Sequence, residues 1–481
     1  MAPDTQQTLR DSLRRVVVAW LFGAAWMYLA SGASFTRYAK LLNVSNFGFG
    51  LLAAIPFIGA LVQLPASFLL ERYGHRKQTF LWCATLHRFL WLVIAALPWL
   101  LPVRWQWPGL LIAILASTIL ANITSPAWMS WMAELIPGRI RGRYFSRRIQ
   151  LGQAVGLALS FFSGLALDWP KPDEQALLRN VISGLFAIAG VCGIADILLF
   201  IKVPDNAKAS HRPSLRFRDL IRGPLADSNF RRFLGYSFTM TLATGFIGQF
   251  VWLYLFDAVG MSNVRANILL VSAPLVVGMA SYPFWGRIVD RFGSKPALLA
   301  AGILVVNGAT SWILVTPESW IPGYLLVLSS SFAWAGMDIA SFNLLLRMTQ
   351  PRGGPRTSDS AVVAINSVAV AIAGTLSGLF GGGVAEWLGS DWRTTVLGWP
   401  MTYHGVLFLC SGILRLAAVG WILTLKEPPG AIATRDALRY MAADIYSNLL
   451  QATIFPARMF IRLARATWKI RTVFPKGDRH E

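Results

Sequence analysis

The feature that most constrains the fold is a series of about twelve apolar runs, each long enough to cross a membrane. A spanning helix needs roughly 20 mostly apolar residues. Charged residues make up only 14% of the 481 residues, well below the share found in soluble domains. We therefore expect an all-α integral membrane protein. The expected spans are 16–34, 47–70, 79–101, 108–131, 149–167, 181–201, 233–256, 266–285, 297–315, 323–346, 361–380 and 406–425.

The chain is strongly basic, with a net charge of +21, and the position of that charge decides its meaning. Of the 44 Lys and Arg residues, 35 fall at the N-terminus, in one alternate set of loops and in the C-terminal tail, whereas 7 fall in the other loops. Membrane proteins keep their basic loops in the cytoplasm. We therefore predict that both termini are cytoplasmic, in a multi-pass protein of the cytoplasmic membrane. The basic charge then reflects topology, and nucleic acid is not an expected partner.

A polar interval divides the runs into two groups of six, and a polar tail follows the last run. The expected units are an N-terminal half (1–201), a central cytoplasmic loop (202–232), a C-terminal half (233–425) and a tail (426–481). In the tail, Leu438, Met441, Ile445 and Leu449 share one helical face, and further basic residues follow. Such a helix is expected to lie on the anionic inner leaflet of the bilayer. A regulatory partner is the alternative.

The two groups of six carry matching landmarks, which indicates an internal duplication. "ERYGHRK" begins at Glu71, and "DRFGSK" begins at Asp290, so the acids and the following glycines, Gly74 and Gly293, are both 219 residues apart. Glycines of the fifth span also match glycines of the eleventh. Two like-oriented halves are typical of alternating-access transporters, whose site lies between the halves near the midplane.

The segment "GRIVDRFGSK" resembles the cytoplasmic signature of the major facilitator superfamily. The second copy carries it in full, whereas in the first copy Ser67 and Glu71 replace a glycine and an aspartate. The acids are expected to approach a helix N-terminus of the other half and latch the cytoplasmic side shut, an inference that the resemblance supports. Arg72 is expected to reach back to Glu134. The alternative is that these loops supply only charge and turns. The expected gate residues are Glu71, Arg72, Gly74, Glu134, Gly286, Asp290, Arg291, Gly293 and Lys295.

An ionisable residue inside the bilayer is costly and is a functional candidate by default. Asp338 lies near the middle of the tenth span. The resemblance implies that helices one, four, seven and ten line the cavity, so Asp338 could accept a coupling proton or pair with a cationic substrate. A structural carboxylic acid is the alternative. Packing is likewise the alternative for the other candidates, which are Tyr28, Asn122, Thr124, Trp128, Tyr236, Gln249, Trp252, Trp334 and Asn343.

Three other charged residues lie within spans, on helices that the resemblance makes peripheral. Arg88 and Asp196 are at similar depth, and we predict a structural ion pair between them. Arg415 is a weaker candidate. No arginine lies mid-span on the four cavity helices, which disfavours a strongly anionic substrate such as a phosphate ester.

The function that fits best is secondary transport of a small organic solute, with proton coupling or downhill movement both open. The alternative is a receptor or assembly factor that does not transport. An enzyme is not expected, because the sequence offers no paired metal-binding aspartates, no histidine cluster and no glycine-rich phosphate loop. We therefore predict no cofactor and no metal site. A monomer is the simplest expected state.

Overall fold

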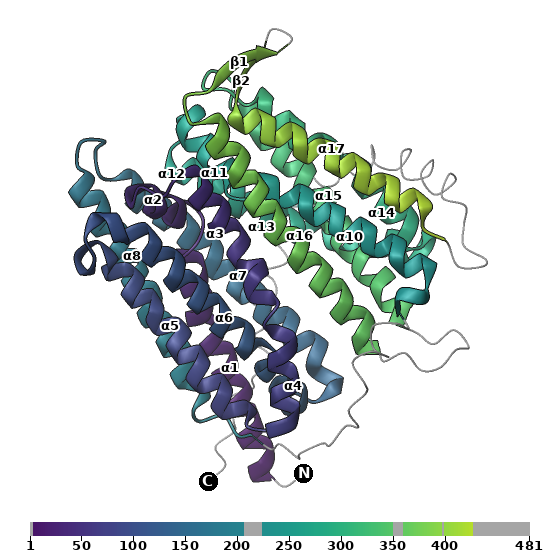
Figure 1. Ribbon diagram of the computed structural model, residues 1–481. Helices are drawn as coiled ribbons and strands as arrows, with labels where there is room; N and C mark the ends of the chain where they lie inside the picture. Colours follow the sequence, from purple (N-terminus) through teal and green to yellow (C-terminus); the bar gives the residue numbers. More distant parts are fainter. Residues whose placement is uncertain (1–2, 206–223, 350–358, 397–398, 427–481) are drawn as a thin grey trace, which may run out of the picture.

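The chain forms two helical bundles that lie side by side (Figure 1). The computed structural model describes residues 3–205, 224–349, 359–396 and 399–426. The first bundle, purple to blue in Figure 1, contains the helices up to residue 205, and the second contains those from residue 224 onward. Most of the central loop and the predicted basic tail beyond residue 426 lie outside the described residues.

The first bundle is built from the six N-terminal apolar runs. Helices α3 and α4 together form one expected span, whereas α2 extends beyond the end of the first expected span and meets α1 at a bend of 46°. Gly32, between α1 and α2, has a φ of 65°, a value that side chains disfavour. The helices are α1 (Pro3–Leu29), α2 (Ala33–Leu41), α3 (Asn46–Ala60), α4 (Gln63–Tyr73), α5 (Arg76–Leu100), α6 (Val103–Leu135), α7 (Gly138–Asp168) and α8 (Gln175–Phe200).

The second bundle repeats this arrangement with more interruptions. Its α-helices are α10 (Ser228–Ile247), α11 (Phe250–Leu253), α12 (Asn263–Asn267), α13 (Ala273–Phe292), α14 (Ser294–Thr310), α15 (Ile321–Thr349), α16 (Asp359–Leu388) and α17 (Tyr403–Thr424). Short π-helical segments η1 (Tyr254–Ala258) and η2 (Ile268–Ser272) and the 3-10 helix η3 (Ser311–Leu314) complete the spans. The described residues contain 11 helices of membrane-spanning length, and the bent α1–α2 pair makes a twelfth. The expected all-α fold of two six-helix halves is therefore confirmed.

A short hairpin was not predicted by the sequence analysis. Strands β1 (Arg393–Val396) and β2 (Trp399–Thr402) pair antiparallel between α16 and α17, with Arg393 opposite Thr402. The segment is rich in Thr, Val and Trp, which favour strands, but it is too short to stand out beside runs of about 20 apolar residues.

The turns of the duplicated motif have the backbone that their glycines predict. Gly74 has a φ of 71° and Gly293 a φ of 92°. A Cβ on either glycine would meet nothing within 4 Å, so the backbone conformation rather than space requires glycine. Both turns lie at the same end of the molecule as the N-terminus, and we call this end the basic face. The opposite end, where α2, α12 and the hairpin lie, is the closed face (Figure 1).

The bundles touch where glycines let two backbones meet. Helices α3 and α16 pack together, and a Cβ on Gly50 would lie 2.4 Å from the carbonyl oxygen of Gly378. A Cβ on Gly382 would lie 2.9 Å from the Cα of Gly50. Helices α7 and α12 form a second contact between the bundles. Of the glycines that match between the fifth and eleventh spans, Gly378 lies at the contact between the bundles, whereas Gly152 makes room for Trp20 of its own bundle.

Candidate substrate site and gate

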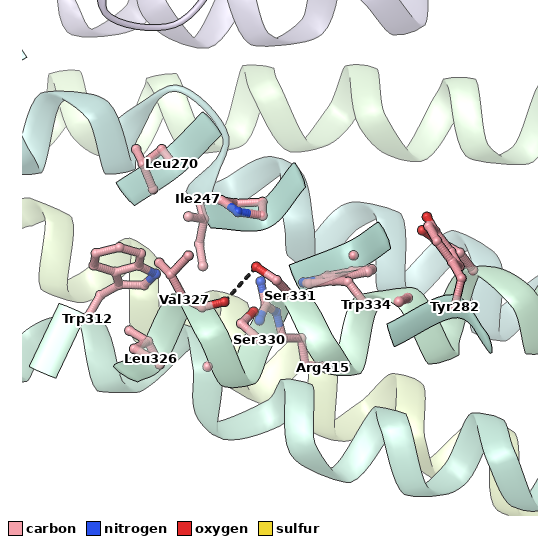
Figure 2. A pocket seen from close by; sticks show the side chains of 15 residues that line it. Ile247, Leu270, Tyr282, Trp312, Leu326, Val327, Ser330, Ser331, Trp334 and Arg415 are labelled. Carbon is pink, nitrogen blue, oxygen red and sulfur yellow. Dashed lines mark hydrogen bonds between the residues drawn. The ribbon is translucent and has the colours of Figure 1, made fainter. Parts of the chain in front are cut away.

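A cavity of about 370 Å³ lies within the second bundle, between α13 and α15 (Figure 2). One face of α15 lines it, because helical periodicity brings Val327, Ser331, Ala335 and Asp338 to the same side. Helix α13 adds Tyr282. The remaining wall includes Ile247, Leu270, Trp312, Leu326, Ser330, Trp334 and Arg415. The cavity is thus mainly apolar, with a few polar groups directed into it, as is typical of small-molecule sites.

Asp338 is exposed and lines this cavity. Its carboxylate accepts a hydrogen bond from the hydroxyl of Tyr282 on α13. Trp334, a second predicted candidate, lines the same cavity about one turn away. The structure therefore brings two of the ten predicted binding residues together.

Several other candidates satisfy their polar groups within the fold. Tyr236 is 4% exposed and lies 3.0 Å, hydroxyl to hydroxyl, from Ser341, which ties α10 to α15. The amide of Asn343 donates to the carbonyl of Ile339, four residues back. For Tyr236 and Asn343 these bonds favour the alternative that the side chain serves packing rather than solute binding. Asn122 and Thr124 likewise donate to carbonyls of their own helix, α6.

The remaining candidates lie in the first bundle or near the closed face. Tyr28 packs on Gly156 of α7, where a Cβ would lie 2.2 Å from its ring. The ring centroid of Trp128 lies 4.7 Å from the guanidinium carbon of Arg148. Gln249 precedes α11 at the break after α10, and Trp252 lies within α11. None of these four lines the cavity that contains Asp338.

The predicted pair of Arg88 and Asp196 is present. Their side chains approach to 3.3 Å, and both are largely buried. The guanidinium of Arg88 also stacks 3.5 Å from the ring centroid of Trp26 and contacts His87. These contacts join α1, α5 and α8 inside the first bundle. The pair is therefore a structural element of that bundle.

Of two further groups in the cavity, the sequence analysis ranked Arg415 as a weaker candidate and missed Tyr282. Arg415 extends from α17, the twelfth span, which the family resemblance placed at the periphery. Its side chain nevertheless reaches the same cavity as Asp338. The signal was visible, because an arginine within a span is a functional candidate wherever its helix lies. Tyr282 carried no such signal, since tyrosines are common in membrane helices.

At the closed face, polar side chains bind the two bundles together. Lys40 forms an ion pair with Asp257, and Arg37 Nε donates to Asn263 Oδ1 over 2.7 Å. Asp168, at the end of α7, accepts hydrogen bonds from the backbone N–H groups of Asn263 and Val264. It therefore caps the first turn of α12, a helix of the other bundle.

Asn267 of α12 is the centre of this closed-face network. It is 2% exposed. Its Oδ1 accepts from the backbone N–H of Ala33 at 3.1 Å, and its Nδ2 donates to the carbonyl of Ser160 at 2.8 Å. One side chain thus links α2, α7 and α12. Among the described residues, the hydrogen bonds and ion pairs found between the bundles lie on this side of the molecule, with Asn46 and Phe47 adding bonds to α16 and the loop after it.

On the basic face, the predicted contact of Arg72 with Glu134 is made by another arginine. Arg76, at the start of α5, approaches Glu134 to 2.5 Å and Asp205 to 2.8 Å. Arg72 instead lies 5.7 Å from the ring of its neighbour Tyr73. The turn at Gly74 directs Arg76 toward α6, which explains the difference. The side chain of Glu71 lies outside the described part of the chain.

In the second copy of the motif, Asp290 and Arg291 are exposed at the end of α13, and Lys295 is the second residue of α14. The ribbons of the two bundles diverge toward this face (Figure 1). A latch formed by Asp290 therefore stays a prediction for a state in which the basic face is closed.

The chain resembles known proteins in both sequence and structure. Residues 16–358 match the model of the Major Facilitator Superfamily. No relative was found among curated protein sequences. A crystal structure of the nucleoside transporter NupG is similar with a TM-score of 0.66 and 13% identity, over 86% of this chain and 100% of that one.

Two further solved structures show the same fold. The D-xylose-proton symporter aligns with a TM-score of 0.62 and 16% identity, over 86% of this chain and 98% of that one. A bacterial homologue of the human lysosomal transporter Spinster, in an inward-facing and unoccupied conformation, aligns with a TM-score of 0.61 and 13% identity, over 89% of this chain and 100% of that one. Because the family model covers more than half of its length, the chain belongs to the major facilitator superfamily of membrane transporters.

Proposed function

We propose that this protein is a secondary active transporter that moves a small organic solute across the cytoplasmic membrane by alternating access. The observation that carries the proposal is the asymmetry of the contacts between the bundles. Polar contacts join them at the closed face, and the bundles diverge toward the basic face (Figure 1). With the basic face in the cytoplasm, as the loop charges favour, this is the inward-open state.

The closed-face network would act as the outer gate. Opening it requires the bundles to separate at Lys40–Asp257 and around Asn267. Each broken hydrogen bond costs little when water replaces the former partner, about 0.5–1.5 kcal/mol. Because several such bonds break together, opening of the gate has to be offset by contacts that form where the bundles meet at the basic face.

We propose that Asp338 carries the coupling proton. It faces the cavity and touches Tyr282 of α13, and the other charged group that lines the cavity is Arg415 of α17. Tyr236 of α10 is close enough to interact with it electrostatically. A carboxylate exposed in the cavity can exchange a proton with solvent from whichever face is open, and this exchange would couple solute movement to the proton gradient.

Uptake into proteoliposomes with an imposed pH gradient tests both proposals. Wild type, Asp338→Asn and the control Asp173→Asn, an exposed loop carboxylate, are screened with nucleosides, pentoses and small organic acids. We expect proton-driven uptake of one class by wild type and by the control, and loss of its pH dependence in Asp338→Asn. Unchanged proton-driven uptake in Asp338→Asn would remove Asp338 from the mechanism. Failure of every solute to move would favour the non-transporting receptor or assembly factor.

A further inference from the structure

Arg415 is a buried cation whose charge the fold does not neutralise. Its side chain belongs to a residue that is 5% exposed, and its Nη1 donates to the backbone carbonyl of Val305 over 2.9 Å. Its Nε is buried without a hydrogen-bond partner. None of the four ion pairs found between described residues includes Arg415. A buried, incompletely bonded guanidinium is costly, so a partner from outside the fold would stabilise it.

The fold gives this guanidinium a path into the cavity. Arg415 starts from α17 and passes α14 at Gly308, where a Cβ would lie 3.7 Å from its Nη1 and 3.4 Å from the hydroxyl of Ser330. It then lines the cavity beside Ser330 and Ser331, with Trp334 5.7 Å from its guanidinium carbon (Figure 2). The small residue on α14 and the hydroxyl-bearing residues on α15 leave a polar recess in an otherwise apolar wall.

The opposite charges of the cavity are set apart. In Figure 2 Arg415 lies beside Ser330, while Tyr282, which bonds Asp338, lies at the far end beyond Trp334. In Figure 2 Trp334 lies between them, and Trp312 and aliphatic side chains line the rest of the cavity. A ligand that fits this arrangement has one anionic end for Arg415 and an apolar body for the aromatic wall.

We propose that Arg415 anchors the carboxylate of a small amphipathic monocarboxylate in this cavity. A guanidinium offers paired N–H donors that match the two oxygens of a carboxylate. One arginine balances one negative charge, and a second charge on the ligand would lie in the apolar part or near Asp338. A phosphate ester is therefore a poor ligand. The assignment rests on the proposed transport function, and it names the class of solute that is carried.

Binding to the purified full-length protein tests the assignment apart from transport. Calorimetric titration compares phenylacetate and hexanoate with phenylacetamide, a neutral analogue, with phenyl phosphate, a dianion, and with the zwitterion phenylalanine. We expect the two monocarboxylates to bind wild type and to bind Arg415→Gln about tenfold or more weakly, as loss of a charge-assisted hydrogen bond predicts. Arg415→Lys should fall between, because it keeps the charge but not the paired donors. The control Arg104→Gln, at an exposed arginine, should bind like wild type.

A second variant guards against misfolding of Arg415→Gln. Gly308→Val keeps Arg415 but fills the gap beside Ser330, and it should weaken monocarboxylate binding as well. Equal binding of phenylacetamide and phenylacetate, or tighter binding of phenylalanine or phenyl phosphate, would overturn the proposal, as would absence of monocarboxylate binding to wild type. Binding that depends on Arg415 without any transport would keep this assignment and remove the proposed function. Transport that is insensitive to Arg415→Gln would remove this assignment alone.

Discussion

The contact between Gly50 of α3 and Gly378 of α16 allows a prediction with a magnitude. A Cβ on Gly50 would lie 2.4 Å from the carbonyl oxygen of Gly378 and 2.5 Å from the Cα of Gly382. A carbon–oxygen contact normally lies at about 3.3–3.6 Å, so Gly50→Ala forces the two helices apart by about 1 Å. The obstructing atoms are backbone and cannot rotate away.

This clash exists only in the state in which the two bundles are in contact at the closed face. Overpacking of this kind costs about 1–3 kcal/mol, and that cost falls on the closed-face state alone if the helices separate in the other state. The equilibrium between the two states should therefore shift by about 5–150-fold toward opening of this face. The intrinsic helix preference for alanine over glycine acts in both states and cancels.

Distances between spin labels measure this shift. Labels at Lys171→Cys and Ser319→Cys report from exposed positions in closed-face loops of the two bundles, in a background in which Cys83, Cys192 and Cys410 are replaced by serine. We expect Gly50→Ala to lengthen and broaden the distance distribution relative to the parent protein.

The matched control is Gly383→Ala. Gly383 lies on α16, the helix that packs against α3, yet a Cβ there would meet nothing within 4 Å. The distance distribution of Gly383→Ala should therefore equal that of the parent protein. An unchanged distribution in Gly50→Ala would refute the reasoning, because the two backbones would then not be in contact in the populated state.

Three further predictions follow from contacts described above. The single mutants Arg88→Asp and Asp196→Arg should each lower the yield of folded protein, because breaking a buried ion pair costs about 3–5 kcal/mol. The double mutant should recover the yield, as measured by fluorescence-detected size-exclusion chromatography. A double mutant with no recovery would contradict the pairing. Asn267→Ala should increase alkylation of cysteines placed at the closed face, because alanine cannot make its hydrogen bonds to both bundles; unchanged alkylation would exclude it from the gate. Arg76→Gln should lower the melting temperature, because it removes an ion pair with the largely buried Asp205 and one with the half-exposed Glu134, which is worth at most about 1 kcal/mol. Arg72→Gln should leave the melting temperature unchanged, and equal effects of the two substitutions would restore Arg72 as the partner of α6.

Much of the fold could be predicted because the membrane imposes a strong and repetitive pattern. Runs of about 20 apolar residues gave the spans, and the match of Glu71 and Gly74 to Asp290 and Gly293 gave the two halves. Helix ends were less accurate: the seventh span begins at Ser228 rather than at residue 233, because a polar first turn such as "SNFRR" extends the helix beyond the apolar run.

The site was harder to predict, because a cavity depends on which side chains of different helices converge. Asp338 was found because a charge within a span is rare, and Trp334 because it is an aromatic residue on a helix that was expected to be central. Arg415 was ranked low because its helix was expected to be peripheral, yet its long side chain crosses α14 to reach the cavity. Tyr236 carried the same signal as a binding residue and instead joins two helices. Polarity identified the candidates, and only geometry separated them.

The location of the cavity within one bundle has a consequence for the transport cycle. Its lining comes from α10 and the helices that follow, and none from the first bundle. A solute bound there would move with the second bundle. Movement of the first bundle would then determine to which side of the membrane the cavity opens. Substitutions in the first bundle should then change the rate of the transport cycle, and substitutions in the second bundle should change the affinity for the solute.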